Sequence, residues 1–257
     1  MWGVIEKFLK KYGEYREENG CTCDNCGREI FTYPEKRLCA DCESRMPVFL
    51  HRCPKCGRNT PGEGVCLECK AHMPTFAAAI SAYPYDGIAA SLINRLKNGD
   101  RYLAGFFADA LAPLTERKLQ NEGLCKEDVL FTCVPDRKEE RVKRRERRYN
   151  PAAELLRRTC EVLGVSCDEE IMRKSRETRP QKRMNAKERF ENVRGAYRVH
   201  KRSVCENRTI VVFDDIMTTG ATGDECARIL AAAGAKRVIF VTATSVSAKK
   251  DFPAFAE

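Results

Sequence analysis

Hydrophobic positions from about Thr75 onward alternate between two patterns. Short continuous apolar runs bounded by turn residues predict strands of a buried sheet, and apolar residues recurring every three or four positions predict helices. Asn98-Gly99 marks the end of one helix, while Pro151 and Gly164 fit the first turn and the end of another. The expected strands are 76–87, 128–135, 208–215 and 236–246, and the expected helices are 87–100, 102–114, 151–164 and 223–235.

This alternation predicts an α/β domain with a mostly parallel sheet flanked by helices, over residues 75–250. A cysteine-rich module is expected at residues 21–72. Residues 1–20 mix charged side chains with Val4, Ile5, Phe8 and Leu9, which suits a short amphipathic helix.

Composition narrows the class of protein. The chain has 257 residues, of which 43% are hydrophobic and 32% charged, as in water-soluble globular proteins. No apolar run is long enough to cross a bilayer, so no membrane insertion is expected. The first twenty residues lack an uninterrupted signal-peptide core, so a cytoplasmic location is expected.

Cysteine spacing points to metal. Nine of the fifteen cysteines lie between Cys21 and Cys69, and eight of these form four consecutive Cys-x-x-Cys pairs. A thiolate pair on a tight turn spans one edge of a zinc tetrahedron, and Gly27 and Gly57 follow two of the pairs where a turn needs positive φ. Disulfides and redox pairs are the alternatives. The lack of a secretory signal disfavours disulfides, and a redox motif is normally a single pair near a βαβ unit. The pairs are Cys23/Cys26, Cys39/Cys42, Cys53/Cys56 and Cys66/Cys69.

The simplest assignment is two structural Zn²⁺ ions, each held by two consecutive pairs. A cross-braced pairing remains open, Cys21 is spare, and His51 and His72 are not needed as ligands. Two filled sites change the formal net charge of +9 to about +5, which weakens the overall basic balance as an argument for nucleic acid.

The stretch Thr209–Leu230 combines two kinds of chemistry. Asp214 and Asp215 end an apolar strand, and a tight turn, Thr218-Thr219-Gly220-Ala221-Thr222, follows and leads into a helix. Backbone N–H groups, hydroxyls and a helix N-terminus suit a phosphate, whereas paired carboxylates suit vicinal hydroxyls or hydrated Mg²⁺. A ribose 5-phosphate carries a phosphate for the turn and vicinal hydroxyls for the two carboxylates. The plainer alternative is a capped helix after a strand with two exposed acids.

This constellation resembles the motif with which type I phosphoribosyltransferases bind phosphoribosyl pyrophosphate (PRPP). The resemblance implies that the aspartates contact the ribose hydroxyls, that the Thr/Gly loop holds the 5-phosphate, and that Mg²⁺ accompanies PRPP. In a transferase, Asp214 and Asp215 would stabilise positive charge developing on the sugar. The acceptor is not indicated by the sequence.

Further motifs resemble the ComF family, which includes the competence protein and the GntX-like proteins. They are Tyr85-Asp86-Gly87 with INRLKNGD, Val134-Pro135, RRYNPAAELL, and the stretch 172–199 with Arg176, Thr178, Gln181, Arg189 and Asn192. The resemblance runs from Cys23 to about Thr244 and implies a phosphoribosyltransferase-like domain behind an N-terminal double zinc ribbon. Arg148 and Pro151 depart from the family pattern, which bears on turnover more than on PRPP binding.

Three functions follow as hypotheses. The first is a PRPP-dependent transferase. The second is a non-catalytic accessory protein in DNA uptake, as the ComF resemblance implies, working on single-stranded DNA with competence or recombination proteins. The third is a zinc-ribbon interaction protein with a relic second domain. Residues 136–148 hold eight Lys or Arg against four acids, and 173–189 is also basic. These basic stretches could contact the pyrophosphate of PRPP, bind single-stranded DNA, or simply form a solvated surface of mixed charge.

Overall fold

The structure is a computed structural model that describes residues 22–31, 36–136, 149–179 and 184–248. The helix expected at 1–20, the spare Cys21, Arg148 and Gln181 lie outside the described residues. So does most of the basic stretch 136–148.

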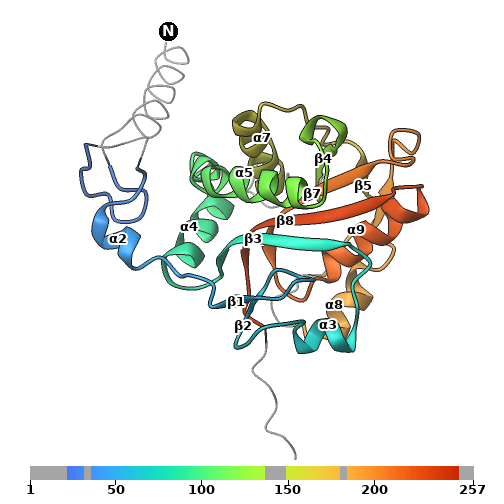
Figure 1. Ribbon diagram of the computed structural model, residues 1–257, viewed down its shortest axis with the longest axis horizontal. Helices are drawn as coiled ribbons and strands as arrows, with labels where there is room; N and C mark the ends of the chain where they lie inside the picture. Colours follow the sequence, from blue (N-terminus) through green and yellow to red (C-terminus); the bar gives the residue numbers. More distant parts are fainter. Residues whose placement is uncertain (1–21, 32–35, 137–148, 180–183, 249–257) are drawn as a thin grey trace, which may run out of the picture.

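A four-stranded parallel sheet forms the centre of the molecule (Figure 1). Its spatial order is β3 (Ala78–Pro84), β8 (Arg237–Ser245), β7 (Thr209–Met217) and β4 (Leu130–Cys133). Both faces of such a sheet are covered, which is why its strands are apolar along nearly their whole length. The α/β fold class expected from the sequence is confirmed.

Alternate residues of the central strands enter two different cores. Val211 and Phe213 pack with α4 (Gly87–Asn98), α5 (Leu103–Asn121) and α7 (Pro151–Leu163). Ile210 and Val212 pack with α9 (Ala221–Ala232) on the opposite face. Figure 1 shows α5 and α7 on one side of the sheet and α9 on the other.

Helices α4 and α7 begin and end close to the positions expected from the sequence, whereas α9 spans Ala221–Ala232 instead of 223–235 and α5 is longer than expected. Asp86 accepts a hydrogen bond from the Gly87 N–H (2.8 Å) at the start of α4, so the Tyr-Asp-Gly motif is a helix start. Gly164 ends α7 at φ +69°. Helix α5 continues through Pro113 to Asn121 instead of ending near 114, because its buried face extends to Thr115 and Leu119.

Three short elements in the stretch 172–199 did not follow from the sequence pattern. β5 (Met172–Lys174) and β6 (Tyr197–Val199) form an antiparallel pair, and α8 (Ala186–Val193) lies between them in the chain. A capping box starts α8: Asn185 accepts from the Glu188 N–H, and the Glu188 side chain accepts from the Asn185 N–H. A 3₁₀-helix, η1 (Lys126–Asp128), precedes β4.

The cysteine-rich region forms two modules that contact different parts of the α/β domain. The first contains α2 (Ala40–Ser44), and its Arg37 pairs with Asp109 of α5 at 2.9 Å. The second contains β1 (His51–Arg52), β2 (Asn59–Thr60) and α3 (Leu67–Ala71).

The second module packs against β3, one of the two edge strands of the sheet. The Ala79 N–H of β3 donates to the Lys55 carbonyl at 2.9 Å, and Arg52 Nη1 donates to the Ser81 carbonyl at 2.7 Å. An edge strand otherwise presents unpaired backbone groups. Across the described ranges, no helix has both the length and the apolar character needed to cross a membrane.

Candidate functional site

Two clusters of four cysteines lie in the two modules, and the sequential pairing is the one observed. Within each cluster the sulfur atoms all lie within 4.8 Å of one another. The first cluster is Cys23, Cys26, Cys39 and Cys42, and the second is Cys53, Cys56, Cys66 and Cys69.

Each cluster combines a turn with a helix N-terminus. Cys39 and Cys66 are the N-cap residues of α2 and α3, so the second pair of each cluster lies on a helical first turn. The sequence interpretation placed all four pairs on tight turns. This holds for the first pairs, where Gly27 and Gly57 have φ of +72° and +68° as expected.

The donor set fits zinc. The Cys26–Cys39 and Cys56–Cys66 sulfur distances are 3.8 and 3.6 Å, and a tetrahedron with Zn–S bonds of about 2.3 Å has edges of about 3.8 Å. Both clusters could therefore hold Zn²⁺, which binds thiolates. His51 and His72 are in neither cluster.

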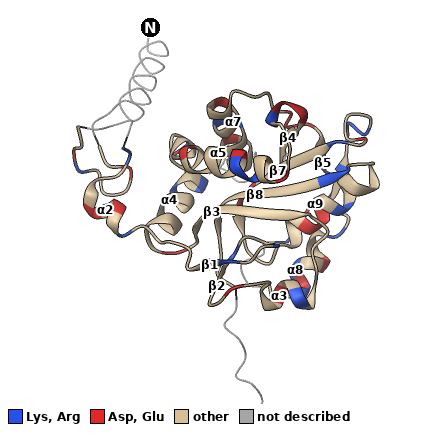
Figure 2. Ribbon diagram, viewed as in Figure 1, with Lys and Arg blue, Asp and Glu red and all other residues tan. Residues whose placement is uncertain are grey.

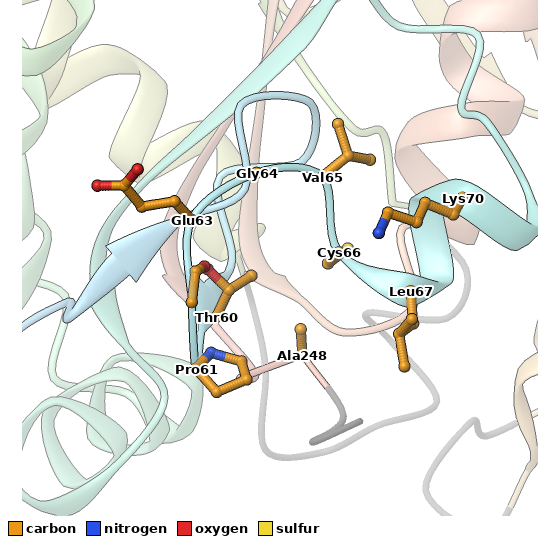
Figure 3. Close-up of a pocket in the computed structure, with 10 residues that line it drawn as sticks. Thr60, Pro61, Glu63, Gly64, Val65, Cys66, Leu67, Lys70 and Ala248 are labelled. Carbon is orange, nitrogen blue, oxygen red and sulfur yellow. The ribbon is translucent and has the colours of Figure 1, made fainter. Parts of the chain in front are cut away.

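A hollow beside the second cluster is separate from the candidate phosphate loop (Figure 3). It lies between the chain from Thr60 to Leu67, α3 and Ala248, and none of its lining residues belongs to 218–222. Cys66 and Lys70 contribute to its wall.

Asp214 and Asp215 lie within β7, which continues two residues beyond the end expected at Asp215. The strand continues to Met217, because Ile216 and Met217 keep the register with Thr244 and Ser245 of β8. Both carboxylates are half-buried, and Asp214 Oδ1 accepts from the Asp215 N–H at 2.8 Å. The pair therefore lies near the carboxyl end of the sheet, where α/β proteins bind ligands.

Lys97 is a site residue that sequence reasoning did not assign. Its Nζ lies 2.9 Å from Asp215 Oδ2, and both side chains are largely buried. Lys97 comes from the INRLKNGD motif at the end of α4, and that motif was the available signal. Burial, and then the Asp215 carboxylate, raise the pKa of the Asp214 carboxyl to about 8. Asp215 is thus an ionised carboxylate paired with Lys97, and Asp214 is largely protonated near pH 7.

The tight turn expected at 218–222 is shorter in the structure: residues 218–220 connect β7 to α9, and Ala221 and Thr222 belong to the first turn of the helix. Gly220 has φ +85° and is the N-cap residue of α9, with no side chain capping the helix there. A Cβ at Gly220 would meet its nearest neighbour, Met217 Sδ, at 3.6 Å, so conformation rather than space requires glycine. The first N–H groups of α9 lack intrahelical acceptors and can bind an anion.

The Val134-Pro135 segment follows β4 and lies beside β7. The Val134 N–H donates to the Phe213 carbonyl at 2.8 Å, and Asn150 Nδ2 donates to the Val134 carbonyl at 2.9 Å. Pro151, one of the two departures from the ComF pattern, occupies the first position of α7. A proline is well suited to that position, so the helix start is preserved.

The described ComF-pattern residues of 172–199 hold their own segment together. Arg176 Nη2 donates to the carbonyls of Asn192 (3.0 Å) and Arg194 (2.6 Å). The Asn192 side chain makes two hydrogen bonds to the backbone of Arg179. Figure 2 shows Lys and Arg interspersed with Asp and Glu along the described helices.

Comparison with known families identifies one match. Residues 152–255 match the family model described as "Phosphoribosyl transferase domain", a range that includes Asp214, Asp215 and the loop 218–222. The α/β domain is phosphoribosyltransferase-like. Its parallel sheet flanked by helices is of the type I phosphoribosyltransferase kind. No curated protein matches the chain.

Two solved structures are similar over more than half of the chain. A purine phosphoribosyltransferase from Pyrococcus horikoshii has 14% identity and a TM-score of 0.32, covering 59% of this chain and 94% of that one. The protein TT1426 from Thermus thermophilus has 18% identity and a TM-score of 0.30, covering 62% and 91%.

Proposed function

We propose that this chain binds PRPP together with Mg²⁺. The observation that carries the proposal is the half-buried Asp214-Asp215 pair directly ahead of a loop with an αL glycine that opens α9. The loop 218–222 would hold the 5-phosphate, and the aspartates would accept hydrogen bonds from the ribose hydroxyls.

The reaction we propose is transfer of the phosphoribosyl group to an acceptor. The Asp215 carboxylate, and Asp214 once it has lost its proton, would stabilise positive charge on the sugar as the bond to pyrophosphate breaks. Lys97 would keep Asp215 oriented, since the two side chains form an ion pair of 2.9 Å. Partly exposed carboxylate oxygens suit Mg²⁺, which when bound would neutralise the pyrophosphate leaving group.

The two cysteine clusters support structural Zn²⁺ as the second part of the proposal. The full assignment is a ComF-like protein with two Zn²⁺ ions, acting in the cytoplasm. The sequence motifs quoted above support this assignment.

A second candidate function is an accessory role in DNA uptake, through single-stranded DNA and competence or recombination proteins. The observation that favours it is the basic stretch 136–148, with its eight Lys or Arg against four acids. Contacts with DNA phosphates would make that binding strongly salt-dependent.

Ligand competition tests the proposal. Isothermal titration of the zinc-loaded chain with PRPP in Mg²⁺ should give a measurable heat, and ribose 5-phosphate should compete because it carries both recognised groups. Free ribose should not compete. The proposal is wrong if PRPP gives no heat, or if free ribose displaces PRPP as well as ribose 5-phosphate does. Release of pyrophosphate in a panel of acceptors then separates the transferase from the accessory protein.

A further inference from the structure

One buried arginine joins the second cysteine cluster to the candidate phosphate loop. Arg58 is 4% exposed. Its Nε donates to Cys56 Sγ at 3.3 Å, and its Nη1 donates to the Thr218 carbonyl at 2.9 Å. Glu68 Oε1 lies 3.8 Å from the same Nη1. A buried guanidinium is costly unless such partners surround it, so these contacts fix its position.

A second contact reaches the first turn of α9, from the end of the module and from the segment that follows it. His72 Nε2 lies 3.0 Å from Asp224 Oδ2, and the Thr75 N–H donates to Asp224 Oδ1. Asp224 is in the first turn of α9, and its N–H donates to the Gly220 carbonyl at 2.8 Å. The second module and the segment directly after it therefore contact the chain on both sides of Gly220, at Thr218 and at Asp224.

The Arg58 contact also sets the direction of a peptide group. In a planar trans peptide the carbonyl and the following N–H point in opposite directions. Because Arg58 holds the Thr218 carbonyl toward the module, the Thr219 N–H points away from it. That N–H is one of the backbone donors that the loop would offer to a phosphate.

A metal ion in the second cluster would organise the turn that directly precedes Arg58. Arg58 directly follows the Cys53–Gly57 turn, whose two cysteines are half of the cluster. Small modules of this kind obtain their folding free energy from the metal. Loss of metal would therefore release the arginine that anchors the loop.

We propose that Arg58 is a positioning residue that couples metal occupancy of the second cluster to phosphate binding by the loop 218–222. This inference rests on the proposed function. Coupling between two sites is reciprocal, so PRPP should retain metal in the second cluster by the same factor by which metal favours PRPP.

The first cluster supplies a matched control. Arg45 Nη2 lies 4.0 Å from Cys42 Sγ, but the Arg45 side chain is exposed, and its other contacts are with Asp41. Arg45→Met therefore removes an arginine beside a cluster thiol and leaves the contacts of residues 218–222 unchanged.

The experiment uses the full zinc-loaded chain in two measurements. In calorimetry with Mg²⁺ and PRPP, Arg58→Met should weaken binding by about tenfold, as expected for loss of a charged hydrogen bond. Arg45→Met should bind within about twofold of wild type, and Arg58→Lys should recover part of the loss. In the second measurement, zinc transfer from wild type to a chromogenic chelator is followed with and without PRPP. PRPP should slow one of two zinc-release phases, and Arg58→Met should abolish that protection.

The outcomes separate this inference from the proposed function. If wild type does not bind PRPP, both are wrong. If wild type binds PRPP but PRPP leaves both zinc-release phases unchanged, the coupling is wrong and the PRPP site stands. Equal affinities for wild type and Arg58→Met would also overturn the coupling. The zinc-release measurement on wild type decides the matter even if Arg58→Met fails to fold.

Discussion

Docking of the second module on the sheet edge can be tested at a single glycine. A Cβ on Gly57 would collide with the Ala79 carbonyl oxygen of β3 and lie 3.0 Å from the Ala79 carbonyl carbon and 3.2 Å from Ile80 Cα. Gly27 is the equivalent glycine of the first module, with a similar φ, and a Cβ there meets nothing within 4 Å. The pair of substitutions Gly57→Ala and Gly27→Ala therefore isolates the contact with β3.

The expected difference follows from these contacts. Both substitutions force alanine into the left-handed region, at a shared cost of about 1–2 kcal/mol. Gly57→Ala adds overpacking of about 1–3 kcal/mol. It also displaces the Ala79 N–H from the Lys55 carbonyl, a loss of about 0.5–1.5 kcal/mol. Gly57→Ala should thus destabilise the fold by about 1.5–4.5 kcal/mol more than Gly27→Ala does.

Scanning calorimetry of the zinc-loaded variants measures this difference, with zinc content checked for each. For a chain of this size about 1 kcal/mol shifts Tm by about 2–4 °C, so Gly57→Ala should melt at least about 3 °C below Gly27→Ala. Hydrogen exchange at the Ala79 amide should accelerate only in Gly57→Ala. Equal melting temperatures and equal exchange at Ala79 would refute the docking of this turn on β3.

Three further predictions concern metal, charge and nucleic acid. Protein purified without added zinc should contain about two equivalents by metal analysis, and one or none would contradict the two-site assignment. The pKa of the Asp214 carboxyl rises from 3.8 to about 8, so the folded chain holds a proton that the unfolded chain has lost. Stability should therefore fall as pH rises through this window, by up to about 1.4 kcal/mol per pH unit from this group. In urea titrations Asp214→Asn should lose that dependence, and an unchanged slope would count against the raised pKa. Single-stranded DNA should bind through residues 137–148 and 173–189 with affinity that falls steeply with salt. Binding that survives neutralisation of both stretches would exclude this route.

Local sequence patterns predicted much of the fold. The four central strands are continuous apolar runs, and the helix starts at Asp86 and Asn150 have explicit caps. The cysteine pairs and the Asp-Thr-Gly stretch were visible because each is a local motif. The elements missed, β5, β6 and α8, are short and mostly polar, so their periodicity is weak.

Contacts between distant segments could not be predicted in the same way. Arg58 and Thr218 are 160 positions apart, and Lys97 of helix α4 contacts Asp215 of strand β7. The strand order places β8 beside both β3 and β7, and a run of apolar residues contains no information on that order. Pairing of the cysteines was open for the same reason, because spacing alone fits both sequential and cross-braced sites.

The most direct test of the central claim is calorimetric titration with PRPP and Mg²⁺ of wild type, Asp215→Asn and a control, Asp128→Asn. Asp128 is an exposed acid in η1, at the amino end of β4. Asp215→Asn removes a charged acceptor worth about 1.5–3 kcal/mol, so its affinity should fall by about tenfold to a hundredfold. Asp128→Asn should bind like wild type. No heat with wild type, or an Asp215→Asn affinity equal to that of wild type, would show that the loop is only the start of a helix.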